Sequence, residues 1–246
     1  MVRCIRNEEI ETLGEALVKS FTEKMEYKPM YCLDIDGFIT DYLKADLIYE
    51  SIAEPDKRKL GFLSDGVSSL KVVKSGKVMD VVYPKNTIVI EKYLLHPCES
   101  GRRRFTAAHE AGHIVLQRHC SLETQASFFR LYEGSTGLDR KKKDELYDIN
   151  EQYANRMAAC LLMPRNLMAR LLKEYNDGGA VKIYQGVLAA REKLLIQKLA
   201  DLVGASFTSF LNRLRELKLM ETCTIEEYMK ERVLKEVTDE QELPFL

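Results

Sequence analysis

The pentapeptide HEAGH, from His109 to His113, constrains this chain more than any other part of its sequence. Residues four apart on a helix lie on one face, one turn apart, so both imidazoles can be directed at a single metal ion. The surrounding stretch 101–120 is rich in Ala and favours a helix. Because the chain has only four His, roughly 0.005 such matches are expected by chance. The pattern therefore predicts a metal-binding helix.

Glu110 directly follows the first histidine and points away from the face that His109 and His113 share. From there its carboxylate can reach a water on the metal. Zinc lowers the pKa of such a water to about 7, and a neighbouring carboxylate can take its proton. The pattern thus predicts a zinc site for hydrolysis, with Glu110 as general base. Ala111 and Gly112 are small, which lets another element pack closely against the helix.

A catalytic zinc site needs a third protein ligand, and the residues alone leave several candidates. His119 has the spacing of a longer motif, HExxHxxGxxH, but Leu116 stands where that motif needs a helix-breaking Gly. On a continuing helix, His119 lies about 240° around the axis from His113. Cys120 lies roughly 10 Å along the axis, too far to share the ion. The remaining candidates are the acidic residues Asp144, Glu145, Asp148 and Glu151.

Residues 45–92 have the pattern of a small, largely antiparallel sheet. Short runs rich in Val, Ile and Tyr alternate with turn residues. Ser75-Gly76 lies between two such runs and predicts a two-residue hairpin. The expected strands lie within 47–52, 60–64, 69–74, 77–84 and 86–95.

Helical periodicity dominates on both sides of this sheet. Pro164 is expected to stop the last helix of the N-terminal part. We expect a loop with short pieces over 122–148, and an all-helical sequence from about 180 to 235. The other expected helices are 8–25, 36–43, 101–120 and 149–163.

Residues 199–217 have the spacing of a helix-turn-helix, with Gly204 at the turn and Ser206 as N-cap of the second helix. The charges of this segment sum to only about +1, too little for a strong phosphate footprint. The segment therefore favours packing or substrate docking over DNA contact. Its charged residues are Arg213, Arg215 and the following Lys218, against Asp201 and Glu216.

Composition excludes several classes of protein. The net charge of −1 argues against non-specific coating of nucleic acid. The sequence has no run of about 18 apolar residues and no apolar segment near its start, so we expect a cytoplasmic protein without a membrane partner. The six Cys form no C-x-x-C pair and are expected to be free, mostly buried thiols. The basic runs 102–104 and 140–143 are expected to be solvated surface.

The segment RRRFTAAHEAGHIVLQRH, followed by EQYANRMAACLLMP, resembles the ImmA/IrrE family of zinc metallo-endopeptidases. Members typically have Phe-Thr before the HExxH element, then a Glu followed by Ala-Asn and a Leu-Leu-Met-Pro ending. The resemblance covers residues 8–165 in layout and is sharp over 100–120 and 149–165. The family's usual Phe is replaced by Met157. The matching residues are Phe105, Thr106, His109, Glu110, His113, Glu151, Ala154, Asn155 and Leu161 to Pro164.

This resemblance implies that Glu151 is the third zinc ligand and Glu110 the catalytic base, with one zinc per chain. It implies an α+β, zincin-like fold, in which a small twisted, mostly antiparallel sheet packs on the HExxH helix. We expect a peptidase domain over 1–175 and a helical, helix-turn-helix-like subdomain over 176–246. Asn155, one turn from Glu151, is placed either to support a zinc histidine or to bond local backbone.

The resemblance further implies an intracellular protein of a bacterium or mobile element that cleaves a repressor-type transcription regulator, itself a helix-turn-helix protein. Two other hypotheses stay open. The chain could be a metal-sensing or DNA-binding regulator that uses the C-terminal helix-turn-helix around a structural zinc site. It could also be an inactive adaptor that only binds a repressor.

Overall fold

The structure is a computed structural model of the 246-residue chain. It describes residues 5–26, 30–56, 59–119, 140–184, 186–227 and 229–230, with backbone alone over 140–148. The chain divides into two compact units. The first comprises Met1–Arg165 with Leu202–Ala205, and the second comprises Asn166–Asp201 with Ser206–Leu246.

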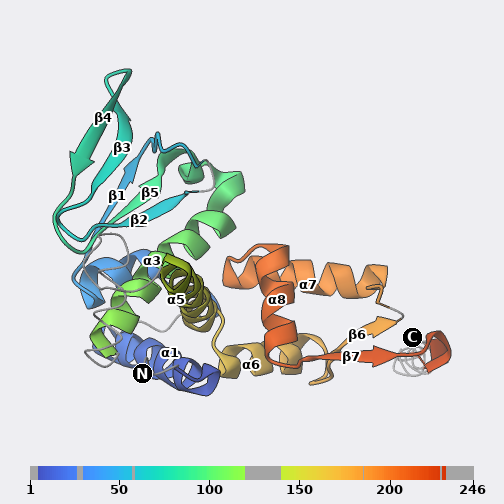
Figure 1. Cartoon of the computed structure of the whole chain (residues 1–246). Helices are drawn as coiled ribbons and strands as arrows, with labels where there is room; N and C mark the ends of the chain where they lie inside the picture. Colours follow the sequence, from blue (N-terminus) through green and yellow to red (C-terminus); the bar gives the residue numbers. More distant parts are fainter. Residues whose placement is uncertain are drawn as a thin grey trace, which may run out of the picture. The chain divides into compact units, whose positions relative to one another are not determined.

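A three-stranded sheet in the order β1-β5-β2 forms the centre of the first unit (Figure 1). Strand β5 (Thr87–Glu91) is an almost continuous apolar run and is buried on both faces. β2 (Gly61–Leu63) pairs with it antiparallel, as expected. β1 (Asp46–Glu50) pairs with it in parallel, so the expectation of a largely antiparallel sheet holds only in part. Parallel strands are joined by a long crossover connection, so no pattern among neighbouring residues indicates that β1 and β5 run in the same direction.

Strands β3 (Ser69–Lys74) and β4 (Lys77–Val82) form the predicted hairpin. Its turn residues Ser75 and Gly76 both have positive φ, 51° and 74°. Two consecutive positive φ values define the type I′ turn, whose twist matches that of the flanking strands. The hairpin prediction is therefore confirmed.

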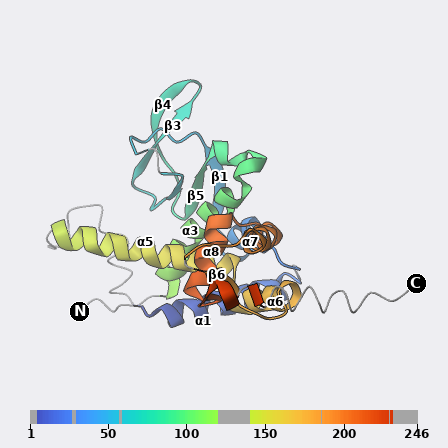
Figure 2. The same cartoon turned by 90° about the vertical axis from the view of Figure 1, so that its right-hand side faces the viewer.

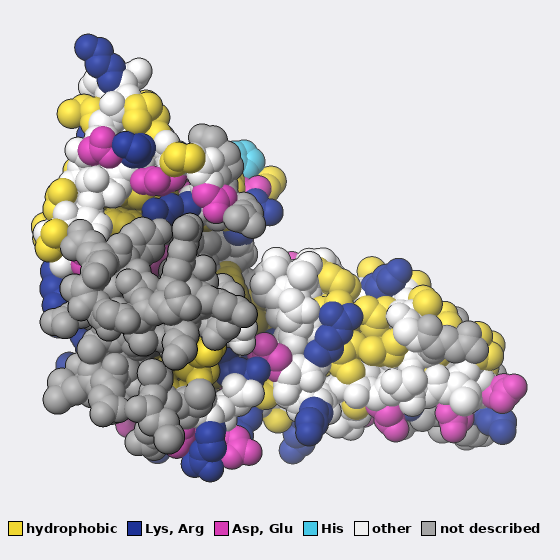
Figure 3. All heavy atoms as spheres, in the orientation of Figure 1, with side chains coloured by type: hydrophobic (Ala, Val, Ile, Leu, Met, Phe, Trp, Pro, Cys, Tyr) yellow, Lys and Arg dark blue, Asp and Glu magenta, His cyan; other side chains and the backbone are white. Residues whose placement is uncertain are grey.

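The two faces of this hairpin differ in burial. Leu70 and Val72 point into a core cluster and are fully buried. Val73, Val78 and Val82 lie on the opposite face and are exposed by 39%, 62% and 53%. Apolar side chains are visible on the hairpin in Figure 3.

Helix α5 (Arg140–Leu162) lies beside both α1 and α3 and packs against them (Figure 2). α5 ends just before Pro164, as predicted, but it begins at Arg140, so the expected loop over 140–148 is wrong. This segment holds strong helix formers and no Gly or Pro. The other helical elements are α1 (Asn7–Lys24), α2 (Ile35–Gly37), the π-helical turn η1 (Phe38–Tyr42), the 3-10 turns η2 (Lys92–Leu95) and η3 (Pro97–Glu99), and α3 (Ser100–His119).

The basic run 102–104 was expected to be solvated surface, and this is wrong for two of its residues. Arg104 is buried; its guanidinium donates to the carbonyl oxygens of Leu33 (2.7 Å) and Gly204 (3.1 Å). Arg103 donates to both carboxylate oxygens of Asp36 at 2.8 and 3.0 Å. These bonds attach the first half of α3 to its neighbours, because a buried guanidinium must satisfy its donors.

The cysteines described by the structure are free, but the expectation that most are buried is not met. Cys160 is buried, Cys32 and Cys223 are partly buried, and Cys98 is exposed.

The second unit is not all helical, contrary to expectation. Val181–Tyr184 (β6) pairs in parallel with Met220–Cys223 (β7). Both strands are only four residues long, and a short apolar run cannot be assigned to strand or helix by periodicity alone. Its described helices include α6 (Arg165–Tyr175), α7 (Ala190–Val203) and α8 (Phe207–Glu216).

Helices α7 and α8 form the predicted helix-turn-helix. They are bent by 100° relative to each other, and Gly204 in the turn has a φ of +65°. The Ser206 side chain caps α8 by accepting from the Ser209 amide at 3.1 Å. Arg213, counted above among possible phosphate contacts, is fully buried and pairs with Glu216 at 3.3 Å. Its guanidinium is therefore not exposed for contact with a DNA phosphate.

Within the described ranges, no single helix is long and apolar enough to cross a membrane. Helices α7 and α8 reach the required length and composition only when taken together, across their 100° bend.

Candidate metal centre

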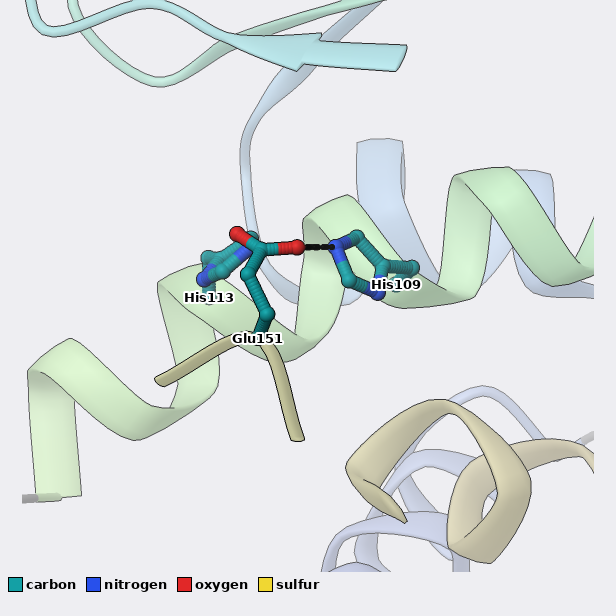
Figure 4. A group of neighbouring side chains, drawn as sticks. All are labelled: His109, His113 and Glu151. Atoms are coloured by element: carbon teal, nitrogen blue, oxygen red, sulfur yellow. Dashed lines mark hydrogen bonds and ion pairs between the residues drawn. The ribbon is translucent and has the colours of Figure 1, made fainter. Parts of the chain in front are cut away.

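Three of the residues singled out from the sequence meet at one point in the first unit (Figure 4). His109 and His113 come from successive turns of α3, and their Nε2 atoms lie 3.1 Å apart. Glu151 comes from α5 and places Oε2 3.1 Å from His109 Nε2 and Oε1 3.4 Å from His113 Nε2. One ligand atom from each residue falls within 4.8 Å of the others. Two imidazoles and a carboxylate on one point are the donor set of a catalytic zinc site, so this group could hold zinc.

The three side chains interact electrostatically, and this shifts the pKa values of His109 and Glu151. Burial by itself lowers the pKa of His109, but the hydrogen bond to Glu151 and the charges of Glu110 and Glu151 raise that pKa above its ordinary value. For Glu151 the two effects have the opposite signs. Burial raises the pKa of its carboxyl group, but the hydrogen bonds from His109 and His113 lower this pKa by more, so it lies far below its usual range.

Glu110 lies against the sheet rather than among the three converging side chains. It is buried, and burial raises the pKa of its carboxyl group, although the charges of His109, His113 and Lys59 oppose this rise. Gly61 of β2 faces it: a Cβ added there would collide with Glu110 Oε1 and lie 2.8 Å from Thr106 Cγ2. The absent side chain thus makes room for the Glu110 carboxylate.

Gly61 and Lys59 were not identified from the sequence. A glycine inside a short apolar strand is a general signal of a close backbone approach. It does not indicate which element approaches, so Gly61 could have been suspected, but not connected with Glu110. Nothing in the sequence around Lys59 links it to the site.

Gly112 explains how α5 can bring Glu151 so close to α3. A Cβ at this position would lie 3.0 Å from the carbonyl oxygen of Ala154 and 3.3 Å from Met157 Cβ. The two helix backbones therefore meet where α3 has no side chain, as the small residues of the pentapeptide had suggested.

Replacing Gly112 with Val is expected to lower the unfolding free energy of the zinc-free protein by about 1–3 kcal/mol, because the added methyl groups overpack the contact with α5. Urea denaturation followed by circular dichroism measures this change. Ala16→Val, on the exposed face of α1, controls for the helix propensity of Val. Equal stability of the two variants would contradict the role given to Gly112.

Asn155 also joins the group, one turn after Glu151 on α5. Its Oδ1 lies 2.9 Å from Nδ1 of His109. Of the two roles left open by the sequence, the structure shows the contact with a histidine of the group.

Of the other candidates for the third ligand, the structure describes the side chain of His119 alone. His119 is exposed at the end of α3 and is not part of the group. Cys120 and the side chains of Asp144, Glu145 and Asp148 are outside the described part of the chain.

An HExxH helix beside a small sheet, with a glutamate from a second helix at its two histidines, defines a zinc metallopeptidase. The model of the M78 peptidase family, described as the IrrE N-terminal-like domain, matches residues 40–215. Because this match covers well over half of the chain, the protein belongs to the ImmA/IrrE family, as the sequence resemblance indicated. The family implies a zincin-like fold and zinc as the metal. A search among curated proteins finds no match.

Proposed function

We propose that the protein is a zinc-dependent endopeptidase, in which His109, His113 and Glu151 hold one zinc ion and Glu110 is the general base. The convergence of the three donor atoms within 4.8 Å carries this proposal. The buried carboxylate of Glu110, on the residue adjacent to one of these donors, supports it.

In the proposed reaction, bound zinc supplies a Lewis acid that polarises the peptide carbonyl and makes water more acidic. Glu110 accepts a proton from the attacking water on its carboxylate. It then donates this proton to the nitrogen of the leaving amine. The raised pKa of Glu110 suits this role, because the carboxyl group must hold the proton between the two steps.

The proposed substrate is a helix-turn-helix repressor in the cytoplasm of a bacterium, or one carried by a mobile element. The family resemblance supports this choice, and α7 with α8 offers a segment suited to substrate docking rather than to DNA. The buried Arg213 speaks against the alternative of a DNA-binding regulator, because it removes one of the few basic side chains of α8 from solvent.

A comparison of newly formed protein N-termini tests this function. Zinc-loaded wild-type protein and Glu110→Gln are each incubated with an extract of the host cell, and new α-amines are labelled and identified by mass spectrometry. We expect a new N-terminus in a repressor with the wild type alone. If no terminus depends on Glu110, while a repressor is still retained on the immobilised protein, the chain is an adaptor and the proposal is wrong.

Zinc affinity is expected to fall as pH falls, with an onset above the ordinary titration range of histidine. The raised pKa of His109 means that the metal-free protein keeps this proton to a higher pH than a free imidazole does. Below that pKa, one proton must leave for each zinc bound, so the apparent dissociation constant should rise about tenfold per pH unit. Chelator competition between pH 6 and 8.5 measures this slope. A dissociation constant independent of pH over this range would contradict it.

A further inference from the structure

We propose that Asn155 is a positioning residue that keeps a proton on Nδ1 of His109, so that Nε2 is the nitrogen offered to the metal. This inference rests on the proposed function and adds a supporting residue to the three proposed zinc ligands and the general base. Asn155 does not touch the metal position itself, and it acts through His109.

The contact between the two side chains defines the tautomer. The Oδ1 atom of Asn155, 2.9 Å from His109 Nδ1, can only accept a hydrogen bond. The Nδ1 atom must therefore be the donor. In a neutral imidazole the other nitrogen, Nε2, then carries the lone pair. This is the nitrogen that lies 3.1 Å from both His113 Nε2 and Glu151 Oε2.

Both ring nitrogens of His109 therefore contact side chains of α5. Glu151 meets the Nε2 side, and Asn155, four residues later on the same helix face, meets the Nδ1 side. The docking of one helix therefore supplies the third candidate ligand and orients one of the two histidines. Partners of this kind typically change metal affinity by 10–100-fold when they are lost.

Packing does not explain the contact. Asn155 is exposed, whereas Ala154 and Met157 beside it are buried and carry the contact of α5 with α3. A substitution at Asn155 should consequently leave the fold intact, which makes its effect on zinc interpretable.

The first test measures zinc affinity by chelator competition for the wild type, Asn155→Leu and Asn155→Asp. Leu has a similar size but accepts no hydrogen bond, and we expect it to raise the dissociation constant by about 10–100-fold. Asp keeps an acceptor for the Nδ1 proton, and we expect it to stay within about tenfold of the wild type. Asn212→Leu, an exposed Asn on α8, is the matched control and should leave the value unchanged.

The second test follows the Nδ1 proton itself in the Co²⁺-loaded protein, where the paramagnetic ion moves the N–H protons of bound imidazoles away from the rest of the NMR spectrum. We expect a slowly exchanging His109 N–H in the wild type and its loss by exchange in Asn155→Leu, with the His113 signal as internal reference. An unchanged His109 signal together with unchanged zinc affinity in Asn155→Leu would overturn the inference and leave the proposed zinc site intact. Absence of zinc from the wild type would instead overturn the proposed function.

Discussion

Replacing Glu110 with Gln is expected to lower the rate of peptide hydrolysis by about 10²–10⁴-fold while leaving about one zinc per chain. Gln has nearly the same shape but cannot accept a proton from the attacking water. Glu110 is not one of the three converging residues, and its carboxylate lies beside Gly61, so the side-chain amide of Gln at this position should not disturb the three donor atoms. The effect belongs to the proton transfer and should appear in kcat.

Stability separates this loss from unfolding. Burial raises the pKa of Glu110, so its ionised form costs stability at neutral pH, and a neutral Gln removes that cost. The zinc-free variant should therefore have a Tm equal to or above that of the wild type. Glu23→Gln, on the exposed end of α1, is the control with the same chemical change. Activity of Glu110→Gln within tenfold of the wild type would exclude Glu110 as the general base.

Replacing Glu151 with Ala is expected to weaken zinc binding by more than the 10–100-fold that the loss of a supporting residue typically causes. The substitution removes the only carboxylate of the group, leaving two imidazoles on one helix. The substitution also removes the hydrogen bond from His109 to Glu151, which raises the pKa of His109. A lower pKa of His109 would reduce the competition between protons and zinc, but this effect is small compared with the loss of a ligand.

The measurement is zinc per chain by plasma mass spectrometry, followed by chelator competition, for the wild type, Glu151→Ala and His119→Ala. His119→Ala is the matched control, because the sequence alone made His119 a competing third ligand and the structure places it outside the group. Zinc retained in Glu151→Ala but lost in His119→Ala would transfer the third position to His119. No zinc in any of the three proteins would favour the adaptor or regulator.

The sequence alone determined the features that depend on neighbours along the chain. The HEAGH pentapeptide places both imidazoles on one face of α3, because residues four apart on a helix always do. The two-residue hairpin turn at Ser75-Gly76 and the capped helix-turn-helix at Gly204 and Ser206 were predicted for the same reason. In each case a few consecutive residues decide the local backbone.

Only the tertiary structure decided what reaches these features from elsewhere in the chain. The residues alone left four acidic side chains open as the third ligand. The approach of α5 to Gly112 brings one of them, Glu151, to the histidines. The tertiary structure likewise decided that Gly61 lies against Glu110 and that Arg104 is buried. Such contacts join residues tens of positions apart, and they depend on how whole elements pack, which no periodicity within one segment encodes.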